Sequence, residues 1–161
     1  MATLGTFTAG SVLTAAELNQ FNNITALVSS TTTVPNATAT AFSYTSAGQV
    51  LVDTSDWHST SVNPTRITVD KNGIYLVGTW CQFAYSGAFV DFSMAVIKNG
   101  TGSPTQDGNI QGDYYPNSAT HTIMTASAGD YFESVAYQTS GGTRSVWAGR
   151  QGFYVMLLRT T

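Results

Sequence analysis

Short apolar runs separated by turn signals fill the chain from about residue 37 to its end. Within the runs, apolar and polar residues tend to alternate and β-branched residues are frequent, as in the strands of a pleated sheet. Gly and Asn mark turns at residues 71–73, 99–100, 128–130 and 140–142. The pattern predicts about eight or nine strands with no helix between them, and therefore an all-β sandwich or barrel, most simply a jelly roll. The predicted strands are 38–44, 49–53, 65–69, 74–85, 90–98, 121–125, 131–138, 144–147 and 152–159.

Two of these strands, 74–85 and 152–159, are apolar on both faces. A monomeric sandwich needs only one buried face per sheet, so the second apolar face predicts a contact between subunits. A homotrimer is our hypothesis, and a monomer with exposed aromatic side chains is the alternative. The opposed sets are Ile74, Leu76 and Trp80 against Tyr75, Val77, Cys81 and Phe83, and Tyr154, Met156 and Leu158 against Phe153, Val155 and Leu157.

The N-terminal part of the chain has a different pattern. Thr14 and Glu17 have the spacing of a capping box, in which a hydroxyl and a carboxylate each accept a backbone amide at the start of a helix. Residues 29–35, which are polar, β-branched and ended by Pro35, are expected to form a linker. Between these segments, apolar residues at helical spacing predict an amphipathic helix. They are Leu18, Phe21, Ile24, Leu27 and Val28.

A helix of about three turns is marginal alone in water, so its apolar face needs a partner. We therefore predict an arm, capped helix and linker for attachment at residues 1–34, and a jelly-roll head at residues 35–161. Packing of the helix against its own head is the alternative. The candidate attachment residues are Phe7, Leu13, Leu18 and Phe21.

Composition excludes several classes of partner. Charged residues make up only 9% of the chain and the net charge is −3, with the basic residues scattered. Without a basic patch, we expect no nucleic-acid binding. No apolar run approaches 18 residues, so we expect no membrane insertion. The N-terminus lacks the basic start and long apolar core of a signal peptide, so a protein found outside a cell would leave by lysis or inside a particle.

No arrangement typical of an enzyme is found, so we predict no catalytic residues, no metal ligands and no cofactor. His58 and His121 have no carboxylate or cysteine at ligand spacing. The carboxylate pairs Asp53–Asp56 and Asp107–Asp113 are better explained by the preference of Asp for turns. Cys81, the only cysteine, is expected to be a buried apolar residue rather than a reactive thiol.

The segment 101–119 is the best candidate for recognition. It is predicted to be a long loop, and such loops in compact domains are often functional. Aromatic rings beside amides and carboxylates suit sugar binding, because ring faces stack on the sugar and polar groups take its hydroxyls. Packing against a neighbouring subunit is the alternative. The candidate ligand-binding residues are Asp107, Asn109, Asp113, Tyr114, Tyr115 and Asn117.

The order and spacing of several peptides in residues 38–159 resemble the trimeric jelly-roll head of the C1q and tumour-necrosis-factor families. They are Arg66-Ile67-Thr68-Val69 leading into Gly73-Ile74-Tyr75, Val96-Ile97-Lys98-Asn99-Gly100, Ala128-Gly129-Asp130-Tyr131 and the closing 153–158. The resemblance implies a binding head in which the Gly-Ile-Tyr strand and the last strand lie in the inner sheet beside a three-fold axis. It implies a strand-entry turn at 129–130 and a trimer interface that includes Tyr75, Val77, Tyr154, Met156 and Leu158.

Residues 6–19, Thr-Phe-Thr-Ala-Gly-Ser-Val-Leu-Thr-Ala-Ala-Glu-Leu-Asn, resemble the opening of many tailed-bacteriophage structural proteins. The chain has no Gly-X-Y run, which removes a complement-type function. The two resemblances together imply a phage virion protein, made in the host cytoplasm and displayed on the virion surface. We expect a minor tail or tail-tip protein for adhesion to host glycans, bound to tail or baseplate proteins through residues 1–34. The alternative is a decoration or head-fibre trimer that stabilises the capsid by binding the major capsid protein.

Overall fold

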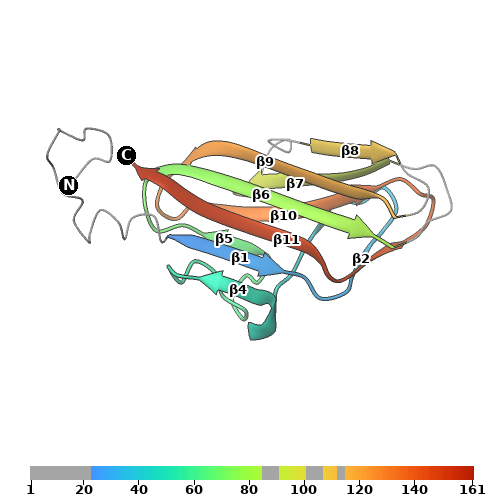
Figure 1. Cartoon of the computed structure of the whole chain (residues 1–161), viewed down its shortest axis with the longest axis horizontal. Helices are drawn as coiled ribbons and strands as arrows, with labels where there is room; N and C mark the ends of the chain where they lie inside the picture. The colour runs from blue at the N-terminus through green and yellow to red at the C-terminus, as the bar shows by residue number, and fades with distance from the viewer. Residues whose placement is uncertain (1–22, 85–90, 101–106, 112–114) are drawn as a thin grey trace, which may run out of the picture.

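The computed structural model describes residues 23–84, 91–100, 107–111 and 115–161, and these form two antiparallel sheets packed as a sandwich (Figure 1). The larger sheet has the strand order β4-β1-β11-β6-β9, with β2 also paired to β11, and the smaller has the order β3-β10-β7-β8, with β5 also paired to β10. The predicted all-β sandwich is confirmed. The strands are β1 (Ile24–Val28), β2 (Thr32–Val34), β3 (Thr40–Ala41), β4 (Val50–Asp53), β5 (Arg66–Thr68), β6 (Gly73–Phe83), β7 (Asp91–Lys98), β8 (Asp107–Gln111), β9 (Asn117–Ala126), β10 (Tyr131–Gln138) and β11 (Arg144–Thr160).

The core lies between the two sheets and is rich in aromatic side chains. Phe83 of β6 and Phe92 of β7 join the sheets, with their ring centroids 4.5 Å apart. Tyr75 packs between Trp57 and Phe132. Along β6 and the second half of β11, alternate side chains are buried, because successive residues of a strand point to opposite faces. Each of these strands therefore has one face in the core and one face outside it, as the alternation in the sequence predicted.

A buried polar network also crosses the core. The amide oxygen of Gln151 on β11 accepts a hydrogen bond of 3.0 Å from the Tyr44 hydroxyl, and its amide nitrogen donates one of 2.9 Å to the Ser134 hydroxyl on β10. The hydroxyls of Ser134 and Thr79, on β6, are 2.6 Å apart. Burial raises the pKa of the Tyr44 hydroxyl above its usual range, so it stays a donor. Because the network joins both sheets, it specifies their relative alignment.

The predicted helix is wrong where the structure describes it. Ile24–Val28 is the strand β1, paired on one side with β11 and on the other with β4. Thr25 and Leu27 are buried while their neighbours are partly exposed, which is the two-residue period of a strand. β-branched Ile24, Thr25 and Val28 suit a sheet, and two flanking strands outweigh a weak helical pattern.

The predicted linker is also partly strand. Thr32–Val34 forms β2, which pairs with the first part of β11, and Val34 is fully buried in the core. The sheet therefore begins before residue 35, where the head was predicted to start. The candidate attachment residues Phe7, Leu13, Leu18 and Phe21, like the predicted capping box, lie outside the described residues.

The turn at residues 71–73 connects two sheets rather than two paired strands. Before it, β5 pairs with β10 in the smaller sheet; after it, β6 pairs with β11 and β9 in the larger sheet. The Tyr75 hydroxyl donates to the Lys71 carbonyl at 2.7 Å and braces this crossing. The chain thus passes around the end of the core at this turn.

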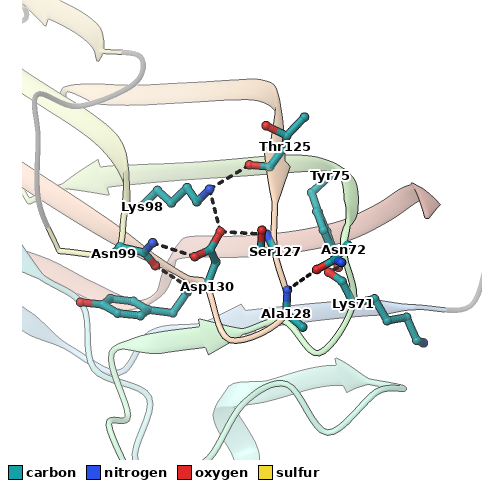
Figure 2. A network of polar contacts seen from close by, with 10 residues as sticks. Lys71, Asn72, Tyr75, Lys98, Asn99, Thr125, Ser127, Ala128 and Asp130 are labelled. Atoms are coloured by element: carbon teal, nitrogen blue, oxygen red, sulfur yellow. Dashed lines mark hydrogen bonds and ion pairs between the residues drawn. The ribbon is translucent and has the colours of Figure 1, made fainter. Parts of the chain in front are cut away.

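A second turn, at residues 127–130, enters β10 as predicted. Gly129 has a φ of 93°, a conformation that glycine adopts without strain. The Asp130 carboxylate binds the Lys98 ammonium at 2.7 Å and accepts hydrogen bonds from the Ser127 amide and the Asn99 side chain (Figure 2). These contacts, with that of Lys98 first, lower the pKa of Asp130 from 3.8 to about 2.

We expect this carboxylate to contribute to stability in a pH-dependent way. Its folded pKa is depressed, so the contribution is complete above about pH 4 and is lost as the pH falls toward 2. Asp130→Asn should lower the unfolding free energy by about 1 kcal/mol at pH 7, a value limited by partial exposure. Thermal unfolding at pH 7, 4, 3 and 2 checks this: the difference in stability between the variant and the parent should shrink as the pH falls. A difference in stability that is the same at every pH would contradict the depressed pKa of Asp130.

Candidate functional site

The outer face of the larger sheet carries apolar rows that run across the strands. Ile24, Met156, Leu76 and Ile123 are successive cross-strand neighbours on β1, β11, β6 and β9. Their side chains point away from the core, and Ile123 is 63% exposed. Side chains in such a row lie close enough to form a continuous apolar surface. The sequence predicted apolar residues on both faces of β6 and β11, and this is the face that lies outside the core.

Aromatic rings lie across glycines in the middle of this face. Tyr154 on β11 is the register partner of Gly78 on β6, and Trp80 on β6 is the partner of Gly152 on β11. A Cβ atom at Gly78 would collide with the Tyr154 ring, and one at Gly152 would collide with the indole of Trp80. The glycines therefore let both rings approach the sheet closely, and 42% of Trp80 remains exposed.

A pocket of about 350 Å³ lies at the Trp80 end of this face, lined by side chains that include Trp80, Gln82, Asn117, Ala119 and Arg150. Ligand sites commonly measure on the order of 300–1,000 Å³, so the pocket could take a small ligand. Cross-strand pairing assembles it, because Trp80 opposes Ala119 and Gln82 opposes Asn117. The small side chain of Ala119 leaves space beside the indole.

A break in the pairing of β11 brings Arg150 to the pocket. Val146 pairs with Phe83 and Gln151 with Cys81, so residues 147–150 face a single residue of β6 and bulge from the sheet. Gly149 has a φ of 72° in this bulge, and its amide donates to the Ser29 carbonyl at 2.9 Å. The predicted strands 144–147 and 152–159 are therefore one strand interrupted by a bulge.

Two more exposed aromatic residues pack together at this end of the molecule. The rings of Tyr115 and Trp147 are 5.8 Å apart between centroids, and the residues are 48% and 44% exposed. Tyr115 immediately precedes the Pro116 carbonyl that accepts the Phe83 amide, which ties this segment to the end of β6. Exposed aromatic residues gathered in one area indicate a binding surface.

The structure divides the predicted recognition segment between the two sheets. Asn117 lies in the pocket and Tyr115 in the aromatic pair with Trp147. Asp107 and Asn109 belong to β8, the edge strand of the smaller sheet, so this part of the predicted loop is a strand. Asp113 and Tyr114 lie outside the described residues. Sequence reasoning missed Trp80, Gln82 and Arg150 as site residues, because strand register and the bulge in β11 bring them together and neither can be seen in a local stretch of sequence.

The predicted interface residues fall on both sides of the larger sheet. Tyr154, Met156 and Leu158 lie on the outer face and are partly exposed. Tyr75 and Val77 are completely buried in the core, facing the smaller sheet. Those two side chains are therefore unavailable to another subunit, and their places on the outer face are taken by Ile74 and Leu76. The family resemblance placed all five residues at one interface, but the structure puts Tyr75 and Val77 on the core side of the sheet and the other three on its outer side.

His58 and Cys81 have structural surroundings. Both ring nitrogens of His58 lie 2.9 Å from backbone carbonyls, those of Arg66 and Tyr44. Cys81 is buried, and burial raises the pKa of its thiol, as expected for an apolar core residue. Within the described ranges, no three His, Cys, Asp or Glu side chains gather as metal ligands. Among the described residues, no helix is long and apolar enough to span a membrane.

No known family model matches the chain, and no curated protein matches its sequence. Its structure is similar to solved structures that share little sequence with it. Murine APRIL has a TM-score of 0.60 at 13% identity, over 84% of this chain and 98% of the other. The globular domain of zebrafish complement 1qA scores 0.58 at 11% identity, over 86% and 98%. The Eiger TNF of S. frugiperda scores 0.56 at 10% identity, over 86% and 93%. The chain therefore has the C1q/TNF-like jelly-roll fold.

Proposed function

We propose that this chain is a homotrimeric bacteriophage virion protein that displays its jelly-roll head for adhesion to glycans of the host surface. The carrying observation is the outer face of the larger sheet, which combines apolar rows with an aromatic and polar pocket. The first feature suits assembly and the second suits ligand binding. The proposed role of the chain is binding rather than catalysis, and no bond is broken.

The trimer is supported by the apolar rows. The row from Ile24 to Ile123 crosses four strands, and Tyr154 adds a flat ring beside it. Soluble monomers rarely expose contiguous apolar areas of this kind, because their contact with water is unfavourable. Three chains packed through this face would remove the rows from water. Three heads would also add avidity, so weak contacts with repeated surface glycans become strong when linked.

The virion location is supported by the sequence. Residues 6–19 resemble the opening of tailed-phage structural proteins, in which such a segment precedes variable domains. We infer that residues 1–22 attach to the particle the head that begins with β1. A minor tail or tail-tip position fits a pocket that is open to a ligand.

A capsid decoration or head-fibre trimer is the second candidate function. The apolar rows would serve it equally well, since reinforcement of a capsid also needs a stable trimer. The decoration function, however, assigns no ligand to the pocket at Trp80. The pocket therefore favours the tail position, and substitutions in the pocket should leave a decoration protein unaffected.

Immunogold labelling of purified particles tests the location, with antibody raised against the full chain. We expect gold at the tail end. Gold scattered over the capsid would establish the decoration function instead. Particles without gold, beside tails labelled normally by an antibody to a known tail protein, would contradict any virion location.

A further inference from the structure

We propose that the pocket between Trp80 and Arg150 binds an anionic saccharide, a pyranose ring that carries a carboxylate. The inference deepens the proposed adhesion and rests on it, because it names the chemical class of the host glycan. Three features of the pocket support it: an exposed indole, two amide side chains and a guanidinium, the last three without partners among the described residues.

The indole of Trp80 is positioned to stack on a sugar ring. It lies over Gly152, where the absence of a side chain lets it approach the backbone of β11. The sheet thus fixes the orientation of the ring, and the exposed 42% of the residue faces solvent at the pocket. A ring held in place loses little freedom when a ligand binds, which favours affinity. The apolar face of a pyranose would cover the exposed indole.

Gln82 and Asn117 supply hydrogen bonds beside the indole. They are cross-strand partners on β6 and β9, and both line the pocket. Each amide offers two donor hydrogens and one acceptor oxygen, the combination that sugar hydroxyls require. Within the described part of the chain, neither side chain is hydrogen-bonded to another protein group. A ligand therefore gains these bonds without first breaking any inside the protein.

Arg150 determines the charge of the ligand. It is the only charged residue among those lining the pocket, and no ion pair joins it to another described residue. Its fixed planar donors match a carboxylate. Because the whole chain has a net charge of −3, its long-range electrostatic field repels an anion. Binding of an anionic sugar must therefore come from this local cation.

The pocket remains accessible in the proposed trimer. Trp80 lies four residues along β6 from Leu76, or about 13 Å at about 3.3 Å per residue. The Leu76 row can be covered by a second subunit while the Trp80 end lies at the rim of the contact. Contact between chains and binding of ligand therefore use different parts of one face.

Titration of the full chain with D-glucuronate, with D-glucose as the neutral probe, tests the proposal by isothermal calorimetry. We expect D-glucuronate to bind at least tenfold more tightly than D-glucose, because a charged hydrogen bond exceeds a neutral one. Arg150→Gln should remove this preference, so that D-glucuronate binds no more tightly than D-glucose. Trp80→Ala should weaken both sugars at least tenfold. Gly152→Ala, which displaces the indole without removing it, should weaken both as well.

Arg159→Ala is the matched control, since Arg159 is an exposed arginine at the far end of the same strand, and it should bind both sugars like the parent. Equal affinity for the two sugars in the parent chain would overturn the anionic ligand. Unchanged D-glucuronate binding by Arg150→Gln and Trp80→Ala, with native circular dichroism, would overturn the site. Neither result would affect the immunogold test, which decides the virion function separately.

Discussion

Gln151→Leu is expected to lower the free energy of unfolding by about 3 kcal/mol, the largest effect on folding stability that we predict for a single substitution. Leucine has a similar volume but no polar atoms. The Tyr44 hydroxyl would lose its acceptor, and the Ser134 hydroxyl would lose a donor, inside the buried core. Each buried polar group left without a partner costs about 1–3 kcal/mol. Urea denaturation followed by circular dichroism measures the change.

Gln82→Leu is the matched control for this prediction. Gln82 is partly exposed on the outer side of β6, so the same chemical change there should alter stability by no more than about 0.5 kcal/mol. Adding Tyr44→Phe to Gln151→Leu should recover part of the loss, because it removes the orphaned hydroxyl. Equal midpoints for Gln151→Leu and the parent would show that the network does not hold the sheets together.

Ile123→Glu is expected to convert the proposed trimer into monomers. Ile123 is 63% exposed in the single chain, so a carboxylate there costs the monomer little. In the trimer it would place three carboxylates in an apolar contact without partners, at a cost of several kcal/mol each, on the order of 3–5. Analytical ultracentrifugation should give the mass of three chains for the parent and of one chain for the variant.

Thr68→Glu provides the control for the oligomeric state. Thr68 is exposed on β5 of the smaller sheet, away from the apolar rows, so this variant should keep the mass of three chains. A parent chain with the mass of a monomer would refute the trimer. A trimeric Ile123→Glu variant would move the contact to another face and leave the apolar rows unexplained.

Strands that are strongly periodic and bounded by clear turns were predicted well from the sequence. Residues 131–138, after the Gly129 turn, were predicted as a strand and form β10 with the same ends. Residues 74–85 form β6 over almost the same range. In both, the alternation of side chains and the flanking glycine agree, so local preference and tertiary packing select the same conformation.

The region around Ile24 was mispredicted because its local pattern fits two structures. Ile24, Leu27 and Val28 have helical spacing, yet the segment also alternates with Thr25 toward the core. Five residues carry too weak a helical preference to decide. Pairing with β11, which lies more than a hundred residues later, selected the strand. No window of sequence around residue 24 contains that partner.

The sequence by itself determined the fold class and the presence of two apolar faces on β6 and β11, because the alternation of side chains is a property of the extended backbone. Only the tertiary structure decided which face is the core, since both faces of β6 carry large side chains with apolar surface, such as Tyr75 and Leu76. Only the tertiary structure placed Arg150 beside Trp80 and Asn117. That proximity depends on strand register and on a bulge in β11, and both are fixed by pairing between residues distant in the chain.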